Sequence, residues 1–260
     1  MPAIHPSAII SEKAKLHPSV QIGPFAIIED NVSIGENTTI ESHCRIYAGT
    51  TIGSANQIKT GAQLGCEPQD LTFTPEKSKP LLIGDNNIFK ENTNISRGVK
   101  TDAGTVIGNN NYFMCGFHMG HDNIIGNNNI LGANSVTAGH VTLYNNIFVS
   151  GVAAIHQFCQ IGDNAMIAGC SKIVKDVPPF MTADGNPARL AGLNAVGLRR
   201  SGFSIKQRSE IKNTYKTLHK SSLNTSQALE QLEQQSNNSD VINTIINFYN
   251  RSERGVTDHR

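Results

Sequence analysis

Aliphatic residues recur at every sixth position along most of this chain. The first series has eleven members without a break: Ile4, Ile10, Leu16, Ile22, Ile28, Ile34, Ile40, Ile46, Ile52, Ile58 and Leu64. A second series runs from Ile83 to Ile173 with the same step, and Thr101 and Thr137 are its two polar members. A step of six fits neither a helix nor an alternating strand. It is typical of a parallel β-helix, in which each hexapeptide forms one face of a prism and three hexapeptides make one coil.

The residues between the aliphatic positions suit the corners of such a prism. Glycine often follows the aliphatic residue, as in Ile22-Gly23 and Ile125-Gly126, and asparagine runs occur at 109–111 and 127–129. Both residue types accept the left-handed backbone conformation that tight corners need. Each coil is too thin to be stable alone, so stability should come from stacking. We predict a prism of nine coils over residues 1–188.

The repeat is interrupted once, between Leu64 and Ile83. An unbroken series would have placed its next aliphatic residue at Asp70, but the series resumes only at Ile83. This predicts an ejected loop at about residues 66–82, which contains three prolines. Loops that leave a rigid scaffold often carry binding groups. A tolerated surface insertion is the alternative.

The pattern changes after Ile173. The pair Pro178-Pro179 should stop the strand ladder, because proline has no backbone N–H. From residue 189 to residue 260 the chain has helical character: Ser204 and Gln207 form a predicted capping box. Three helical stripes follow, made of Ile211, Tyr215 and Leu218, then Ala228, Leu229 and Leu232, then Val241 or Ile242 with Ile245 and Phe248. We expect a small helical domain against the end of the prism.

The charge of the chain indicates which class of partner it binds. The formal net charge is +1, which gives no overall field for nucleic acid. Residues 199–220 hold seven Lys or Arg and the single acid Glu210, without the kind of aromatic interleaving that would suggest base stacking. This basic segment favours an acidic protein partner over nucleic acid.

The location of the protein is also constrained. The five cysteines show no C-x-x-C spacing, as is usual in a reducing compartment. We find neither a secretory signal nor a transmembrane run in the sequence. A cytoplasmic protein is expected.

Four histidines, His118, His121, His140 and His156, fall near one edge of successive coils because their spacing approaches the length of one coil. We expect a column of imidazoles about 10 Å tall. His121 is followed by Asp122, which could orient the ring so that it acts as a general base. Structural corner residues are the alternative reading of these histidines.

The chemistry that such a base supports is direct acyl transfer. The sequence has no nucleophile elbow and no phosphate-binding glycine loop, which disfavours a covalent intermediate or nucleotide hydrolysis. The Gly139 amide, one coil from His121, could bind the oxyanion. Several histidines could instead hold zinc, but the chain lacks the H-x-x-x-x-H pair of hexapeptide carbonic anhydrases, and we expect no metal. A structural or ice-binding solenoid would show flat threonine arrays, which this sequence lacks.

Several motifs resemble one family over nearly the whole length. They are Glu67-Pro68-Gln69-Asp70-Leu71, His118-Met119-Gly120-His121-Asp122, Ala138-Gly139-His140-Val141, Ala154-Ile155-His156-Gln157-Phe158, Asp176-Val177-Pro178-Pro179-Phe180, Gly185-Asn186-Pro187-Ala188 and 197–204. The chain resembles the acyl-carrier-protein:UDP-N-acetylglucosamine O-acyltransferases, which begin lipid A synthesis. The resemblance implies a left-handed β-helix, a homotrimer with sites between prisms, and no cofactor beyond the phosphopantetheine that arrives on acyl carrier protein.

The resemblance also implies roles for individual residues. His121 would be the base that deprotonates the sugar 3-hydroxyl, Asp122 would orient it, and the Gly139 amide would hold the oxyanion. Gly169 matches a position that sets acyl-chain length, where glycine leaves room for a long chain. The substrate-binding residues would be Gln69, Asp70, His118, His140, His156, Gln157, Asn194 and Arg200.

The sequence departs from the family at four positions that touch substrates in relatives. Thr72 replaces a lysine, Ser96 a histidine, Val196 a glutamate and Ser201 a second arginine. Each change removes a polar or charged contact. The acceptor therefore stays open between an acetamido and a 3-amino sugar nucleotide. N-acyltransfer to a glucosamine nucleotide is less expected, because those relatives carry an extra N-terminal domain and here the repeats begin at Ile4.

Overall fold

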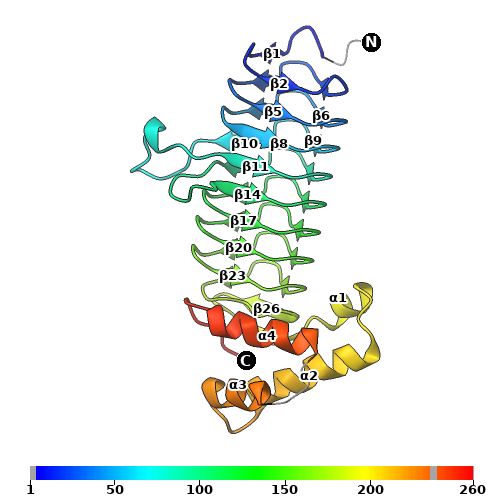
Figure 1. The fold of residues 1–260 in the computed structure, drawn as a ribbon, viewed down its shortest axis with the longest axis vertical. Coiled ribbons are helices and arrows are strands. Elements are labelled where there is room, and N and C mark those ends of the chain that lie inside the picture. The colour runs from blue at the N-terminus through cyan, green and yellow to red at the C-terminus, as the bar shows by residue number, and fades with distance from the viewer. Residues whose placement is uncertain (1–3, 235–238, 260) are drawn as a thin grey trace.

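The computed structural model describes residues 4–234 and 239–259, which form a three-sided prism of stacked coils with helices at one end (Figure 1). Within these residues the strands form three sheets of nine, eight and ten strands. Neighbours in each sheet are parallel, apart from one antiparallel pair at the end of the ten-stranded sheet. The predicted parallel β-helix is confirmed.

Each sheet takes one short strand from every coil. The nine-stranded sheet contains β1 (Ile9–Ile10), β4 (Ile27–Ile28), β7 (Arg45–Ile46), β10 (Gln63–Cys66), β13 (Asn94–Ser96), β16 (His118–Met119), β19 (Val136–Thr137), β22 (Ala154–Ile155) and β25 (Lys172–Ile173). The eight-stranded sheet contains β2 (Lys15–Leu16), β5 (Ser33–Ile34), β8 (Thr50–Ile52), β11 (Leu81–Ile83), β14 (Thr105–Ile107), β17 (Ile124–Ile125), β20 (Thr142–Leu143) and β23 (Gln160–Ile161). The ten-stranded sheet contains β3 (Gln21–Ile22), β6 (Thr39–Ile40), β9 (Gln57–Ile58), β12 (Ile88–Phe89), β15 (Tyr112–Phe113), β18 (Ile130–Leu131), β21 (Phe148–Val149), β24 (Met166–Ile167), β26 (Met181–Gly185) and β27 (Ala188–Leu193).

The six-residue repeat places its aliphatic side chains inside the prism. Ile58, Phe89, Phe113 and Leu131 stack in register on successive coils and are fully buried. The corners need positive φ, and asparagine supplies it at equivalent places on successive coils, as at Asn110, Asn128, Asn146 and Asn164. The positions of asparagine in the sequence therefore match the corners of positive φ on successive coils.

Two loops leave the prism. The predicted loop is present between β10 and β11, over residues 67–80, and contains the short helix η1 (Pro75–Lys77). A second loop, residues 97–104, lies between β13 and β14. The interpretation of Thr101 as a repeat position was wrong. Ile95 pairs with Met119, which is one hexapeptide further along the chain than in a regular coil. The loop therefore adds the length of one hexapeptide, so the six-residue spacing of the aliphatic positions continues unchanged beyond it.

The prolines do not end the sheet as predicted. Val177 bridges Ile161, and beyond Pro178-Pro179 the chain enters β26, which pairs with β24. The prolines lie in the connection, where no ladder hydrogen bond is required of them. Strand β27 then pairs antiparallel with β26 and runs across residue 188, where the prediction divided the chain.

Four helices follow: α1 (Ala195–Arg200), α2 (Ile205–Lys220), α3 (Thr225–Glu233) and α4 (Asp240–Arg251). The capping box at Ser204 and Gln207 is confirmed. Buried residues of α2, α3 and α4 form one apolar cluster, which contains Ile211, Leu218, Ala228, Leu232, Val241, Ile245 and Phe248. None of the helices in the described part of the chain has the length and apolar character needed to cross a membrane.

A titratable histidine lies inside this helical layer. Burial, and to a smaller extent the neighbouring His259, lower the pKa of His219 to about 4. The Tyr249 hydroxyl lies 2.8 Å from Nε2 of His219 and can donate to the unprotonated ring. Protonation of His219 would remove that acceptor.

We expect the helical domain to lose stability as pH falls from about 6.5 to about 4, because the unfolded chain binds a proton there and the folded one does not. The loss should be at most about 3 kcal/mol, and less where solvent reaches the ring. Thermal unfolding at several pH values measures it. In His219→Gln the dependence should flatten, whereas it should persist in His43→Gln, which alters an exposed histidine of the prism. Equal slopes in wild type and His219→Gln would contradict the assignment.

Candidate active site

The corner between β16 and β17 holds His121 and Asp122. Equivalent corners of successive coils carry Asp122, His140 and Phe158, all with positive φ (57°, 59° and 66°). The His140 amide donates to the His121 carbonyl at 3.0 Å, which ties the two coils together. The prism thus fixes these side chains on a rigid edge.

Asp122 is the electrostatic centre of this corner, with only 3% of its surface exposed. The second loop wraps its carboxylate: the amides of Val99, Lys100 and Thr101 donate to it at 3.0–3.2 Å, and the Thr101 hydroxyl donates at 2.9 Å. Burial alone would raise the pKa of Asp122, but hydrogen bonds from Thr101, His121 and Lys100 outweigh it and lower the pKa to about 2. The carboxylate is therefore ionised at neutral pH.

The ionised carboxylate sets the tautomer of His121. Nδ1 of His121 lies 2.7 Å from Oδ2 of Asp122, and an ionised carboxylate can only accept. Nδ1 therefore carries the proton in the neutral ring, and Nε2 has a free lone pair. This leaves Nε2 able to take a proton from a substrate.

Gly139 lies against that nitrogen. A Cβ atom at this position would fall 2.9 Å from both Nε2 and Cε1 of His121. Only glycine lets the backbone approach the ring so closely. The Gly139 amide makes no hydrogen bond within the described part of the chain, so its N–H is available to a developing oxyanion beside the base.

His140 completes the cluster. Its ring meets that of His121 edge-on at 5.2 Å and stacks on Phe158 at 4.8 Å. Burial lowers its pKa, partly opposed by the charge of Asp122. Its Nε2 is buried, makes no hydrogen bond to a described residue and lies 3.8 Å from Oδ2 of Asp122. This nitrogen therefore faces the Asp122 carboxylate and is closed to solvent.

His121, Asp122 and His140 bring their ligand atoms within 4.8 Å of one another, a spacing that could hold a metal ion. Both oxygens of Asp122 already accept several hydrogen bonds. An ion would have to displace these donors, so the local chemistry fits proton transfer better than metal ligation. The expectation of no metal stays a prediction.

The other two histidines do not extend the cluster as a column. Among the described residues only His121 and His140 are in imidazole–imidazole contact at this edge. His118 lies on β16, in register with Val136 on β19, and its Nδ1 is 2.9 Å from the Asn94 amide oxygen. Burial lowers the pKa of His118. His156 follows His140 by slightly less than one coil, which moves it back toward its strand.

The remaining predicted residues lie on other elements. Asn194 caps α1: its side chain accepts from the Gly197 amide and donates to the Asn164 carbonyl. Arg200, in the last turn of α1, and Gln157 are exposed. Gly169 is also exposed, and a Cβ there would meet the Gly151 carbonyl at an ordinary 3.5 Å. An alanine would therefore fit the backbone and occupy surface space.

Gln69 and Asp70 lie on the first loop. Gln69 is exposed, and Asp70 accepts from the Thr72 amide and hydroxyl, each at 2.8 Å. Those bonds lower the pKa of Asp70. Thr72 thus fixes Asp70 in a short turn of the loop.

Sequence reasoning missed the clasp formed by Val99, Lys100 and Thr101. The available signal was Thr101 itself, a polar residue at an aliphatic repeat position. It also missed Phe158, whose ring supports His140.

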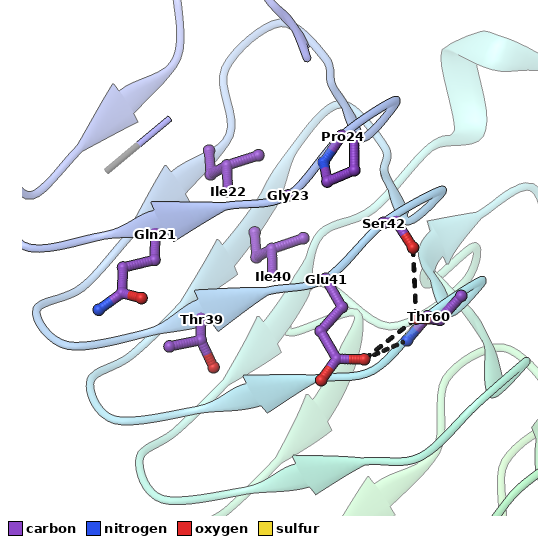
Figure 2. Close-up of a pocket in the computed structure, with 9 residues that line it drawn as sticks. All are labelled: Gln21, Ile22, Gly23, Pro24, Thr39, Ile40, Glu41, Ser42 and Thr60. Atoms are coloured by element: carbon purple, nitrogen blue, oxygen red, sulfur yellow. Dashed lines mark hydrogen bonds between the residues drawn. The ribbon is translucent and has the colours of Figure 1, made fainter. Parts of the chain in front are cut away.

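A separate cavity of about 520 Å³ lies on the N-terminal coils (Figure 2). It is lined by Gln21, Ile22, Gly23, Pro24, Thr39, Ile40, Glu41, Ser42 and Thr60. The Glu41 carboxylate accepts from the Thr60 amide and hydroxyl and pairs with Lys59. Its charge is satisfied locally, and the cavity holds no histidine or thiol. We assign no chemistry to it.

The stacked hexapeptide coils and the His121–Asp122–Gly139 corner define the class as a hexapeptide-repeat acyltransferase. The family model described as bacterial transferase hexapeptide (six repeats) matches residues 13–48, and that described as UDP N-acetylglucosamine O-acyltransferase, domain 2, matches residues 176–257. The acyl-[acyl-carrier-protein]--UDP-N-acetylglucosamine O-acyltransferase of Burkholderia mallei is 41% identical over 194 residues, which cover 73% of this chain and 74% of that protein.

Solved structures agree over nearly the full length. UDP-N-acetylglucosamine acyltransferase of Francisella novicida matches with a TM-score of 0.95 and 36% identity, covering 98% of this chain and 94% of that one. The Bacteroides fragilis enzyme of the same name matches with a TM-score of 0.93 and 41% identity, covering 97% and 98%. The chain belongs to the UDP-N-acetylglucosamine O-acyltransferase family. This confirms the predicted left-handed parallel β-helix and the acyltransferase class.

Proposed function

We propose that this protein transfers a 3-hydroxyacyl group from acyl carrier protein to the 3-hydroxyl of UDP-N-acetylglucosamine, the first step of lipid A synthesis. The observation that carries the proposal is the His121 ring, held through Nδ1 by ionised Asp122 with Nε2 free beside the Gly139 amide. The names of the relatives supply the substrates. No cofactor is needed beyond the phosphopantetheine on the donor.

The step follows from these positions. Nε2 of His121 takes the proton of the sugar hydroxyl as that oxygen bonds to the thioester carbonyl carbon. The electrons of the C=O bond move onto the carbonyl oxygen, and the Gly139 N–H donates a hydrogen bond to the oxyanion that forms. When the C=O bond re-forms, the C–S bond breaks, and the departing phosphopantetheine thiolate takes the proton back from His121. No acyl group is attached to the enzyme.

Residues near this corner and on other elements would bind the nucleotide sugar. By their match to the family these are His118, His140, His156, Gln157, Asn194 and Arg200, with Gln69 and Asp70 from the loop.

The four positions at which the sequence departs from the family lie in different surroundings. Ser96 is fully buried beside Cys66, whereas Val196 is 49% exposed and Ser201 is the C-cap of α1. The missing contacts are therefore at α1 and the loop, which bear on the nucleotide more than on the base.

The test is a panel of acceptors and donors with the purified protein. UDP-N-acetylglucosamine and 3-hydroxyacyl carrier protein should yield a 3-O-acyl nucleotide by mass spectrometry. The 3-amino analogue and donors of several chain lengths are run in parallel, and long chains should react best because Gly169 leaves the surface open. If only the 3-amino nucleotide is acylated, that nucleotide is the acceptor and UDP-N-acetylglucosamine is not. No product with either nucleotide would refute the sugar-nucleotide assignment.

We expect a homotrimer in solution. Outward positions of the ten-stranded sheet form an apolar stripe in register, Ile88, Tyr112, Ile130, Phe148 and Met166, with Ile130 38% and Phe148 37% exposed. Ile124, on the eight-stranded sheet, is 49% exposed. Apolar surface of this kind favours association. Light scattering should give three times the chain mass of 28.1 kDa. A stable monomer at micromolar concentration would contradict both the trimer and a site shared between chains.

Acyl carrier protein should dock on the basic segment 199–220. Lys206 and Lys212 are exposed on α2, and acidic partners are drawn to such surfaces by charge. Reversal of Lys206, Arg208 and Lys212 to glutamate should raise KM for acyl carrier protein about tenfold or more with little change for the nucleotide, and added salt should weaken the wild type similarly. Lys15→Glu, on a coil at the opposite end of the prism, is the control. An acyl-CoA donor that works equally well without a salt effect would contradict the docking surface.

The cellular compartment is inferred from the state of the cysteines. All five cysteines are free thiols, two of them exposed. We infer a cytoplasmic enzyme.

A further inference from the structure

The end of the chain returns from α4 to the prism and is fixed there. The Asp176 amide donates to the Gly255 carbonyl and the Thr257 amide donates to the Asp176 carbonyl, at 2.9 and 2.8 Å. The Ser252 hydroxyl donates to the fully buried Asp176 carboxylate at 2.6 Å. Backbone and side-chain bonds therefore hold Arg254, between these residues, in one place.

Arg254 reaches from this segment to His156. Its Nε donates to the Val174 carbonyl at 2.9 Å, which orients the guanidinium. Its terminal nitrogen lies 2.9 Å from Nδ1 of His156. Arg254 and Glu253 also line a cavity of about 350 Å³ together with His140, Thr142, Phe158 and Gln160. The segment thus borders the catalytic corner from within the same chain.

This contact selects one tautomer of His156. A guanidinium only donates, so Nδ1 must accept and the proton of the neutral ring is on Nε2. The Gln157 carbonyl oxygen is also near Nδ1, at 3.3 Å, and would favour the opposite tautomer. The shorter contact comes from a cation, and hydrogen bonds to charged groups are the stronger ones. Arg254 therefore outweighs the carbonyl.

The selected tautomer leaves a donor facing outward. His156 is exposed, and its Nε2 makes no hydrogen bond to a described residue. A cation at Nδ1 also polarises the ring and strengthens the opposite N–H as a donor. Such a group binds an acceptor oxygen of a phosphate, carbonyl or hydroxyl.

We propose that Arg254 is a positioning residue that fixes His156 with its proton on Nε2, so that His156 donates to an oxygen of the bound nucleotide sugar. This rests on the proposed function for the identity of the ligand, but the tautomer itself does not. Nothing in the sequence pattern indicates the pairing, because the two side chains are far apart along the chain.

Two-bond ¹H–¹⁵N NMR spectra of the ¹⁵N-histidine-labelled full chain read the tautomer directly. The His156 signal is assigned by its loss in His156→Asn. In wild type Nδ1 should be the unprotonated nitrogen and Nε2 the protonated one. In Arg254→Met the proton should move to Nδ1, facing Gln157, whereas Arg254→Lys, which keeps a donor, should restore the wild-type pattern at least in part. Lys175→Met removes the ion pair with Asp258 in the same segment and should change nothing at His156.

Steady-state kinetics separate positioning from general damage. Arg254→Met should raise KM for the nucleotide sugar about tenfold, with KM for the acyl donor unchanged. An unchanged His156 tautomer in folded Arg254→Met, or the same change in Lys175→Met, would overturn the proposal. If the tautomer moves as expected and wild type does not acylate the nucleotide, the pairing stands and the proposed substrate is wrong.

Discussion

Replacement of His121 by alanine should lower the rate of acyl transfer by about 10²–10⁴-fold while the prism stays folded. The side chain is only partly buried at a corner, and its bond to Asp122 is not needed for the stacking of coils. Its loss removes the ring whose Nδ1 is held by the Asp122 carboxylate and whose Nε2 lies against Gly139. Initial rates at saturating donor and acceptor measure the effect.

His43→Ala is the matched control. His43 also lies at a corner with positive φ, but it packs on Phe25 in the N-terminal coils. Its loss should leave the rate unchanged. A His121→Ala enzyme with more than half of the wild-type rate would remove His121 from the role of base.

Asp122→Asn should be nearly as damaging, with a rate loss of about 10²–10⁴-fold. The Val99, Lys100, Thr101 and His121 donors need two acceptor oxygens, and an asparagine side chain has only one. Its NH₂ group would therefore face other N–H groups. The neutral side chain would no longer hold the proton on Nδ1 of His121. We also expect a loss of stability of about 1–3 kcal/mol, because buried donors would be left unpaired.

Asp85→Asn supplies the control for this charge removal. Asp85 accepts from the Ser54 amide in a ladder of corner residues where Asn109 and Asn127 make the equivalent bonds on other coils. The same substitution should therefore be tolerated there in both rate and stability. Full activity in Asp122→Asn would show that the tautomer of His121 is not set by this carboxylate.

The prism was predictable because its repeat has one physical cause. Each inward aliphatic side chain stacks on its counterpart in the next coil, so eleven positions in a row carry the same information. Thr101 shows the limit of that reasoning. A loop as long as one hexapeptide preserves the count, and only the geometry shows that Thr101 leaves the prism to bind Asp122.

The site was predictable in part for a related reason. His121, Asp122 and Gly139 are one coil apart or adjacent, so spacing alone brings them together. His156 and Arg254 are joined by the return of the chain end, which is a tertiary contact without local signal. The column of four histidines was wrong because a small difference in spacing places His156 at a different point of its coil.

Catalysis by His121 as a general base means that the acyl group passes directly from donor to sugar, with no acyl-enzyme. A rapid-quench single turnover tests it, with enzyme in excess over 3-hydroxyacyl carrier protein and with UDP-N-acetylglucosamine present or absent. Intact-protein and product masses are measured in the same samples. The 3-O-acyl nucleotide should rise as the donor is consumed, while the enzyme mass should stay constant at every time point. An enzyme species heavier by one acyl group, on Cys115, Cys170 or any other residue, that forms before the product and decays into it would contradict direct transfer.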